Sequence, residues 1–156
     1  MAIGFELQKD DYVTLEANLQ IFQKGAEVRG AFLCDSGGNI IIEVGKAASC
    51  VDSVSALASG AFSATRALAH AIGEDEFSSI VHQGSRNNIF MSAVDEEVLL
   101  VAVFGQETNN GLVKLEGTKA CRKLLPIFRD IMKRPTVPNE DPTVTFVLAQ
   151  GPLFSR

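Results

Sequence analysis

The sequence predicts a single α/β domain in which an antiparallel sheet is covered by helices. Three observations support this fold class. Segments with helical periodicity and apolar strand segments follow one another in the order helix, two strands, helix, three strands, helix. The segments 30–34 and 98–104 are apolar on both faces, as in central strands that helices cover on two sides. Short polar turns join neighbouring strands, which favours antiparallel pairing.

The first part of the chain predicts a helix and a hairpin. Residues 9–24 carry apolar side chains three and four positions apart, on one stripe: Tyr12, Leu15, Leu19 and Phe22. Gly25 follows where such a helix would end. Strands are predicted at 28–34 and 40–44. The Asp-Ser-Gly-Gly sequence between them is typical of a hairpin turn, because glycine tolerates positive φ.

The second predicted helix, about residues 52–72, is rich in small side chains. Asp52 or Ser53 suits its start, and Gly73 lies where it would end. One face is apolar: Leu57, Ala61, Ala64, Leu68 and Ile72. Another face carries Ser55, Ser59, Phe62 and Arg66. Small residues allow close packing onto the chain's own sheet or onto a second helix, and both interpretations are kept.

Three further strands, a third helix and a tail complete the prediction. The strands are 79–83, 88–94 and 98–104. The helix, about 111–132, contains Pro126, which we expect to bend or interrupt it. We therefore predict a domain at 1–132 and a C-terminal extension at 133–156. The extension begins rich in proline and becomes strand-like near Val144 to Leu148.

Length, charge and composition limit the classes of function. The chain has 156 residues, enough for one domain with a core and marginal for two. Its net charge is −5 and no basic stretch could neutralise several phosphates, so we expect no nucleic-acid partner. The longest weakly apolar stretch, 54–72, contains Arg66 and His70, so we expect no membrane insertion. Three cysteines without CxxC spacing and a start without a signal peptide predict a cytoplasmic protein.

No sequence motif indicates an enzyme. The chain has neither GxxxxGK[ST] nor GxGxxG, so no phosphate or dinucleotide loop is predicted. His70 and His82 lie on different elements, and neither has a partner at metal-ligand spacing. Cys50 is the one cysteine expected to be exposed, and no base lies near it in sequence. We expect no catalytic, cofactor or metal site.

Several segments, taken in order, resemble the Roadblock (dynein light-chain) family, especially its bacterial MglB-type members. They are the hairpin 30–40, the alanine-rich helix 55–64, its exit 68–77, the His-Gln-Gly at 82–84 and the stretch 99–113. The resemblance covers about residues 8–132. It implies a profilin-like α+β fold. In this fold, a five-stranded antiparallel sheet has the central helix on one face and the terminal helices on the other.

The resemblance also implies that the chain acts by binding. Roadblock domains form dimers through the middle helix and a strand edge. The residues so implied here are Ser79, Ile80, Val81, His82, Gln83, Ala64 and Ala67. Residues 79–83 would form an exposed edge, whose unpaired N–H and C=O groups a second copy could satisfy across a two-fold axis.

The MglB-type resemblance further implies a small Ras-like GTPase as partner, whose GTP hydrolysis is promoted without a donated catalytic group. The expected partner surface is Ser55, Ser59, Phe62, Ser63 and Arg66. Phe62 is the expected anchor, since a buried aromatic ring gives the largest contact area, and a core position is its alternative. Two other functions stay open: a nucleotide-independent assembly protein of a motility or polarity complex, and a small-ligand sensor.

Overall fold

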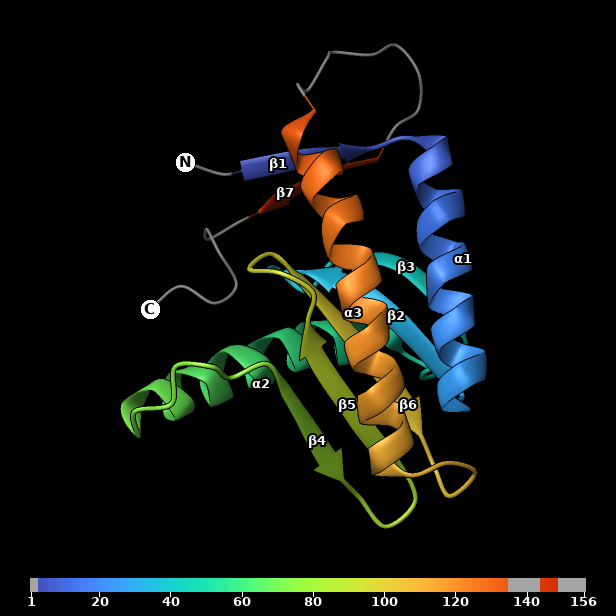
Figure 1. The fold of residues 1–156 in the computed structure, drawn as a ribbon, viewed down its shortest axis with the longest axis vertical. Coiled ribbons are helices and arrows are strands. Elements are labelled where there is room, and N and C mark those ends of the chain that lie inside the picture. Colours follow the sequence, from blue (N-terminus) through green and yellow to red (C-terminus); the bar gives the residue numbers. More distant parts are fainter. Residues whose placement is uncertain (1–2, 135–143, 149–156) are drawn as a thin grey trace.

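The computed structural model describes residues 3–134 and 144–148 (Figure 1). The elements in chain order are β1 (Ile3–Leu7), α1 (Lys9–Ala26), β2 (Gly30–Asp35), β3 (Ile40–Gly45), α2 (Val51–Ala71), β4 (Ser79–Gln83), β5 (Asn88–Ala93), β6 (Val98–Phe104), α3 (Asn110–Lys133) and β7 (Val144–Leu148). Five strands form an antiparallel sheet in the order β3-β2-β6-β5-β4. Strands β1 and β7 form a separate antiparallel pair.

Helices cover both faces of the five-stranded sheet, as the predicted fold class requires. Helix α2 lies on one face, and α1 and α3 lie side by side on the other (Figure 1). Side chains alternate between the two layers along each strand. Leu33 and Leu100 belong to the core under α1 and α3, whereas Phe32 and Leu99 belong to the core under α2. Every residue of β6 is buried, which confirms its predicted central position.

The tip of the first hairpin is fixed by its own carboxylate and by contact with α2. Asp35 Oδ1 accepts hydrogen bonds from the backbone N–H groups of Gly37 and Asn39, each at 2.9 Å. Gly38 has a φ of +82°, which glycine adopts without strain. A Cβ placed on Gly38 would lie 2.7 Å from Ala56 Cα, so the turn touches the backbone of α2.

Helices α1 and α3 differ from expectation in two places. Helix α1 continues past Gly25 to Ala26, and Glu27 takes the left-handed conformation, with a φ of 58°. A Cβ on Gly25 would lie 2.9 Å from Glu116 Oε2, so this glycine allows close approach of α3. Helix α3 runs through Pro126 without interruption; an exposed proline removes one backbone hydrogen bond but leaves the packed face in place.

The sequence did not predict β1, and its partner is the strand foreseen in the C-terminal extension. Phe5 is opposite Phe146 in this antiparallel pair. The division into a domain at 1–132 and an extension at 133–156 stays a prediction. The prolines that prompted it (Pro135, Pro138, Pro142 and Pro152) lie outside the described residues.

Candidate partner interface

The outward face of α2 carries large apolar side chains. Leu57, Leu68 and Ile72 are 74%, 63% and 77% exposed. Exposed Ala61, Ala64 and Ala67 lie between them on the helix. A contiguous apolar patch of this kind on a monomer marks a binding surface more often than chance exposure does.

Opposite this surface, the serine-bearing face of α2 packs on the sheet. Ser55 Oγ donates to the carbonyl oxygen of Gly38 at 2.6 Å, and Ser59 Oγ donates to that of Ser36 at 3.0 Å. Phe62 is fully buried beneath α2, with its ring centroid 5.1 Å from that of Phe77. These contacts attach α2 to the first hairpin and to the segment before β4.

This arrangement corrects the expected partner surface. Ser55, Ser59 and Phe62 lie inside the monomer, because the two hydroxyls satisfy backbone carbonyls and the ring fills the core under α2. Phe62 therefore occupies its alternative, the core position. Ser63 and Arg66 are half-buried, and Arg66 Nη1 donates to the Phe77 carbonyl oxygen at 2.7 Å.

Strand β4 is the edge of the sheet, as predicted for residues 79–83. It pairs with β5 on one side, from Ser79 opposite Ser92 to Gln83 opposite Asn88, and no other described strand pairs with it. Its Ile80 and Val81 are half-buried, while His82 and Gln83 are exposed. The outer row of backbone N–H and C=O groups is thus available to another strand.

A groove connects the α2 surface with this edge. Its volume is about 350 Å³. Helix α2 supplies Leu57, Ala58 and Ala61 to its wall, and the strands supply His82, Ile89 and Met91. The expected dimer residues Ala64 and Ala67 are exposed on the same helix. The groove therefore joins the Leu57–Ala61 part of the apolar face to the open edge.

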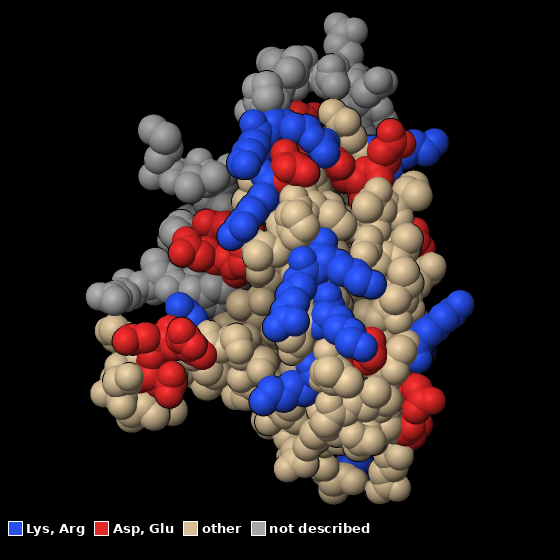
Figure 2. All heavy atoms as spheres, viewed as in Figure 1, with Lys and Arg blue, Asp and Glu red and all other residues tan. Residues whose placement is uncertain are grey.

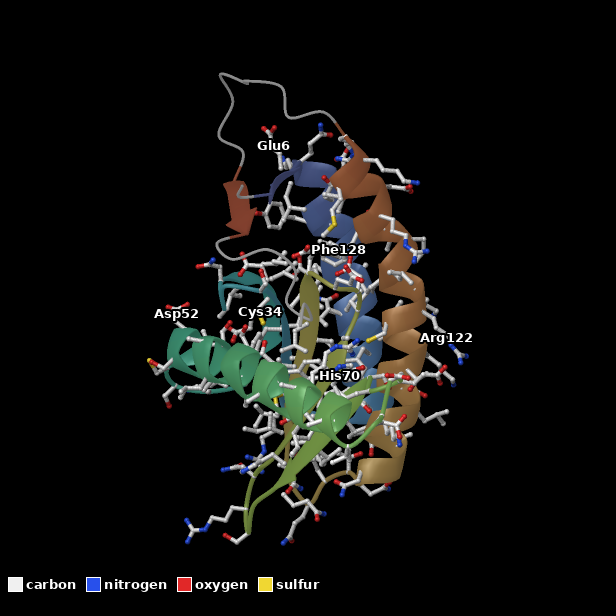
Figure 3. The ribbon with its side chains drawn as sticks, turned by 90° about the vertical axis from the view of Figure 1, so that its left-hand side faces the viewer. Glu6, Cys34, Asp52, His70, Arg122 and Phe128 are labelled. Carbon is white, nitrogen blue, oxygen red and sulfur yellow. The ribbon has the colours of Figure 1, made fainter. Side chains whose placement is uncertain are left out.

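A basic surface that sequence order concealed lies on the other side of the molecule. Helix α3 carries six Lys or Arg residues against two acidic ones, a net charge of +4, whereas the whole chain carries −5. Figure 2 shows Lys and Arg side chains gathered along this helix. In Figure 3, Arg122 points away from the sheet and Phe128 points toward it. The cations are spread along the sequence, and helical geometry brings them onto one face.

The described residues hold little of the chemistry that catalysis needs. They contain no group of three or more His, Cys, Asp or Glu residues arranged to bind a metal ion. Burial raises the pKa of the Cys34 thiol to about 12 and that of Cys121 to about 11, so both stay protonated at neutral pH. Cys50 is exposed, and the hydroxyl of Ser53 beside it lowers its pKa. None of the helices in the described part of the chain has the length and apolar character to cross a membrane.

Comparison with known proteins identifies the family. The model of the Roadblock/LC7 domain matches residues 14–104, more than half of the chain. The chain belongs to the Roadblock/LC7 family. Strand β4 and the exposed part of α2 both fall within the matched Roadblock/LC7 segment.

Solved structures support an MglB-like member of the Roadblock/LC7 family. Myxococcus xanthus MglB is 32% identical with a TM-score of 0.71; the match covers 76% of this chain and 98% of that one. The gliding protein MglB from Thermus thermophilus is 29% identical with a TM-score of 0.75, over 81% of this chain and 96% of that one. An MglB described as having a tetrameric arrangement is 28% identical with a TM-score of 0.76, over the same shares.

More distant structures support only the fold. Acanthamoeba castellanii profilin II is 14% identical, with a TM-score of 0.52, over 73% of this chain and 95% of that one. This likeness agrees with the predicted profilin-like arrangement of sheet and helices. A search of curated proteins finds no match.

Proposed function

We propose that the chain forms a homodimer through the exposed face of α2 and the edge strand β4. The observation that carries this proposal is that the exposed face of α2 reaches the unpaired strand edge at the groove, where Leu57 and Ala61 lie near His82. A two-fold axis would place each edge against its own copy and satisfy both rows of backbone groups together. The small residues Gly60, Ala61 and Ala64 leave room for a second helix.

Apolar burial supplies the driving force for this dimer. Complete burial of one Leu or Ile side chain contributes about 1.5–3 kcal/mol. Three such residues on each copy offset an association cost of roughly 4–15 kcal/mol. The groove and the edge strand add further contact area and hydrogen bonds. The printed description of one relative, an MglB with a tetrameric arrangement, supports self-association in this branch of the family.

We further propose that the dimer binds a small Ras-like GTPase and regulates it, in a motility or polarity system. The support is the similarity to MglB proteins, one of which is described as a gliding protein. Of the five residues first expected on the partner surface, Ser63 and Arg66 keep exposed area and are the contacts that we retain. Arg66 is already held by Phe77, so its proposed role is contact and not insertion as an arginine finger.

Affinity capture with the purified chain, in the presence of GDP or a non-hydrolysable GTP analogue, tests the GTPase proposal. We expect mass spectrometry to identify a small GTPase retained mainly in its GTP-like state. Single-turnover hydrolysis by that purified GTPase should then accelerate when the chain is added, and less so with Arg66→Gln. The Lys114→Gln variant, altered on α3, is the matched control.

Other outcomes of these experiments would contradict the GTPase proposal or favour one of the two alternative functions. Capture that ignores the nucleotide, with unchanged hydrolysis, would favour the assembly protein of a motility or polarity complex. No GTPase in either state would contradict the proposal. A thermal-shift increase with one metabolite from a panel would favour the small-ligand sensor.

A further inference from the structure

A second pocket lies where the β5–β6 turn faces α3, and Arg66 of α2 forms part of its wall. Its volume is about 480 Å³. Three consecutive carboxylates line it: Asp95, Glu96 and Glu97. Leu125 and Met132 of α3 give it an apolar wall. A pocket that combines an apolar wall with convergent polar groups is the usual form of a small binding site.

Glu97 is the unusual residue of this pocket. Its side chain lines the pocket, yet the residue is only 9% exposed. Glu97 Oε2 is buried and has no hydrogen-bond partner among the described groups. A buried carboxylate oxygen without a donor is costly, because ionised groups lose their hydration on burial. The fold therefore leaves one acceptor in this pocket unsatisfied.

The turn that holds Glu97 cannot easily relax to remove this cost. Asp95 Oδ1 accepts the backbone N–H groups of Glu97 at 2.7 Å and Val98 at 2.8 Å, which fixes the turn. Burial raises the pKa of Glu97, and the charges of Asp95 and Glu96 raise it further. Burial also raises the pKa of Asp95, against which the charge of Arg129 acts. A positive charge in the pocket would relieve both the desolvation and the repulsion.

The cations already present do not fill this role. Arg66 lines the pocket, but its Nη1 is bound to the Phe77 carbonyl oxygen. Arg129 is exposed, and its charge lowers the pKa of Asp95. Glu97 Oε2 still has no donor among the described groups. The acidic residues do not form a metal-binding group within the described part of the chain. A compact organic cation suits this pocket, because three carboxylates and an apolar wall meet in it.

We propose that this pocket binds an alkylammonium group, which donates to the Glu97 carboxylate while its methylenes lie against Leu125 and Met132. An ammonium is a small point charge with three donors, suited to one unsatisfied oxygen between other carboxylates. The source is a free amine or a lysine side chain of a partner protein. The site shares Arg66 with the proposed GTPase contact, and its test uses the chain alone, without the GTPase.

The test is a titration of the ¹⁵N-labelled full chain, followed by amide chemical shifts, with n-butylammonium, 1-butanol and butyrate at constant ionic strength. We expect saturable shifts with butylammonium at residues 94–98 and 125–132. Butanol, the neutral analogue, should bind at least about tenfold more weakly, since its hydroxyl can donate to the carboxylate but carries no positive charge. Butyrate should not bind if the carboxylates dominate the pocket.

Variants and peptides complete the experiment. Glu97→Gln should weaken butylammonium binding about tenfold, whereas Glu16→Gln on α1 should leave it unchanged. If butanol bound as tightly as butylammonium, or butyrate bound more tightly than butylammonium, the proposal would be overturned. Both results come from the wild-type chain, so they hold even if Glu97→Gln fails to fold. Peptides Ac-Gly-Lys-Gly-NH₂ and Ac-Gly-norleucine-Gly-NH₂ separate the sources. If the lysine peptide binds and the norleucine peptide does not, the cation is a partner's lysine. If butylammonium binds and neither peptide does, the cation is a free amine.

Discussion

Arg134 binds Asp11 through two hydrogen bonds, from Nη1 to Oδ2 at 2.7 Å and from Nη2 to Oδ1 at 2.6 Å. Asp11 lies in the first turn of α1, and its Oδ2 also accepts the Gln8 backbone N–H at 2.8 Å. Arg134 directly follows α3. One carboxylate thus caps the start of α1 and ties it to the end of α3, next to the paired strands β1 and β7 (Figure 1).

The Asp11→Asn substitution should lower stability at neutral pH and lose its effect in acid. The hydrogen bond from Arg134 holds the pKa of Asp11 below its usual value. Such a carboxyl stabilises the folded state above its unfolded pKa of about 3.9, and this contribution is lost as pH falls through the folded pKa. Because Arg134 is 38% exposed, solvent screening limits the expected cost to about 1 kcal/mol. Urea unfolding at pH 7 and near pH 3 measures it; an equal difference at both pH values would contradict the assignment.

Two helix glycines should respond in opposite ways to alanine. A Cβ at Gly60 on α2 meets nothing within 4 Å in the monomer, so Gly60→Ala should raise the free energy of unfolding of the isolated monomer by up to about 1 kcal/mol. A Cβ at Gly117 on α3 would lie 2.4 Å from the ring of Phe90. Gly117→Ala should therefore destabilise by about 1–3 kcal/mol despite the better helix propensity. Denaturant unfolding of both variants at low protein concentration checks the pair, and a stabilising effect of both would show that helix propensity alone decides.

Gly38→Ala should destabilise the chain more than Gly117→Ala does. The substitution places a side chain at a φ of +82° and brings Cβ within 2.7 Å of the α2 backbone at Ala56. The strain and the clash together cost roughly 2–4 kcal/mol. Gly37→Ala is the neighbouring control, because its Cβ would meet no atom closer than 3.2 Å. Equal melting temperatures for the two variants would disprove the close contact between turn and helix.

Phe62→Ala should act on stability and not selectively on partner binding. The ring is fully buried against Phe77, so its removal should cost about 3–5 kcal/mol. Leu57→Ala, on the outward face of the same helix, should change the stability of the isolated monomer by less than about 1 kcal/mol. Thermal unfolding at low protein concentration compares them. A stable Phe62→Ala variant that loses its partner would restore the surface role first expected for this residue.

The five strands and three helices of this sheet were predictable because hydrophobic periodicity and glycine turns act locally, and their arrangement followed from the family resemblance. It did not predict which face of α2 packs inward. Ser55 and Ser59 are buried because they donate to carbonyls 17 and 23 positions away, and periodicity carries no information on such partners. The small serines let α2 approach the hairpin, and the larger Leu57 and Leu68 are left outside. The more apolar face of α2 is therefore not the face that packs on the sheet.

Long separation in the sequence also explains why two other features, β1 and the pocket around Glu97, were not predicted. Strand β1 has few residues and pairs with β7 at the opposite end of the sequence, so no local turn indicates it. The pocket around Glu97 was not predictable from sequence order, because only the fold brings α3 over the Asp-Glu-Glu sequence. The edge position of 79–83 was predicted from the family resemblance, and β4 lies at the edge of the described sheet.

Sedimentation velocity over a range of concentrations tests most directly the claim that the outward face of α2 and β4 form a dimer interface. Wild type should sediment as a dimer, and Leu68→Lys should shift it to monomer while the circular dichroism spectrum stays unchanged. Leu115→Lys is the matched control, since Leu115 on α3 is a leucine of similar exposure, 54% against 63%. This control should remain dimeric. A wild type that stays monomeric at all concentrations, or a Leu68→Lys variant that stays dimeric, would contradict the account.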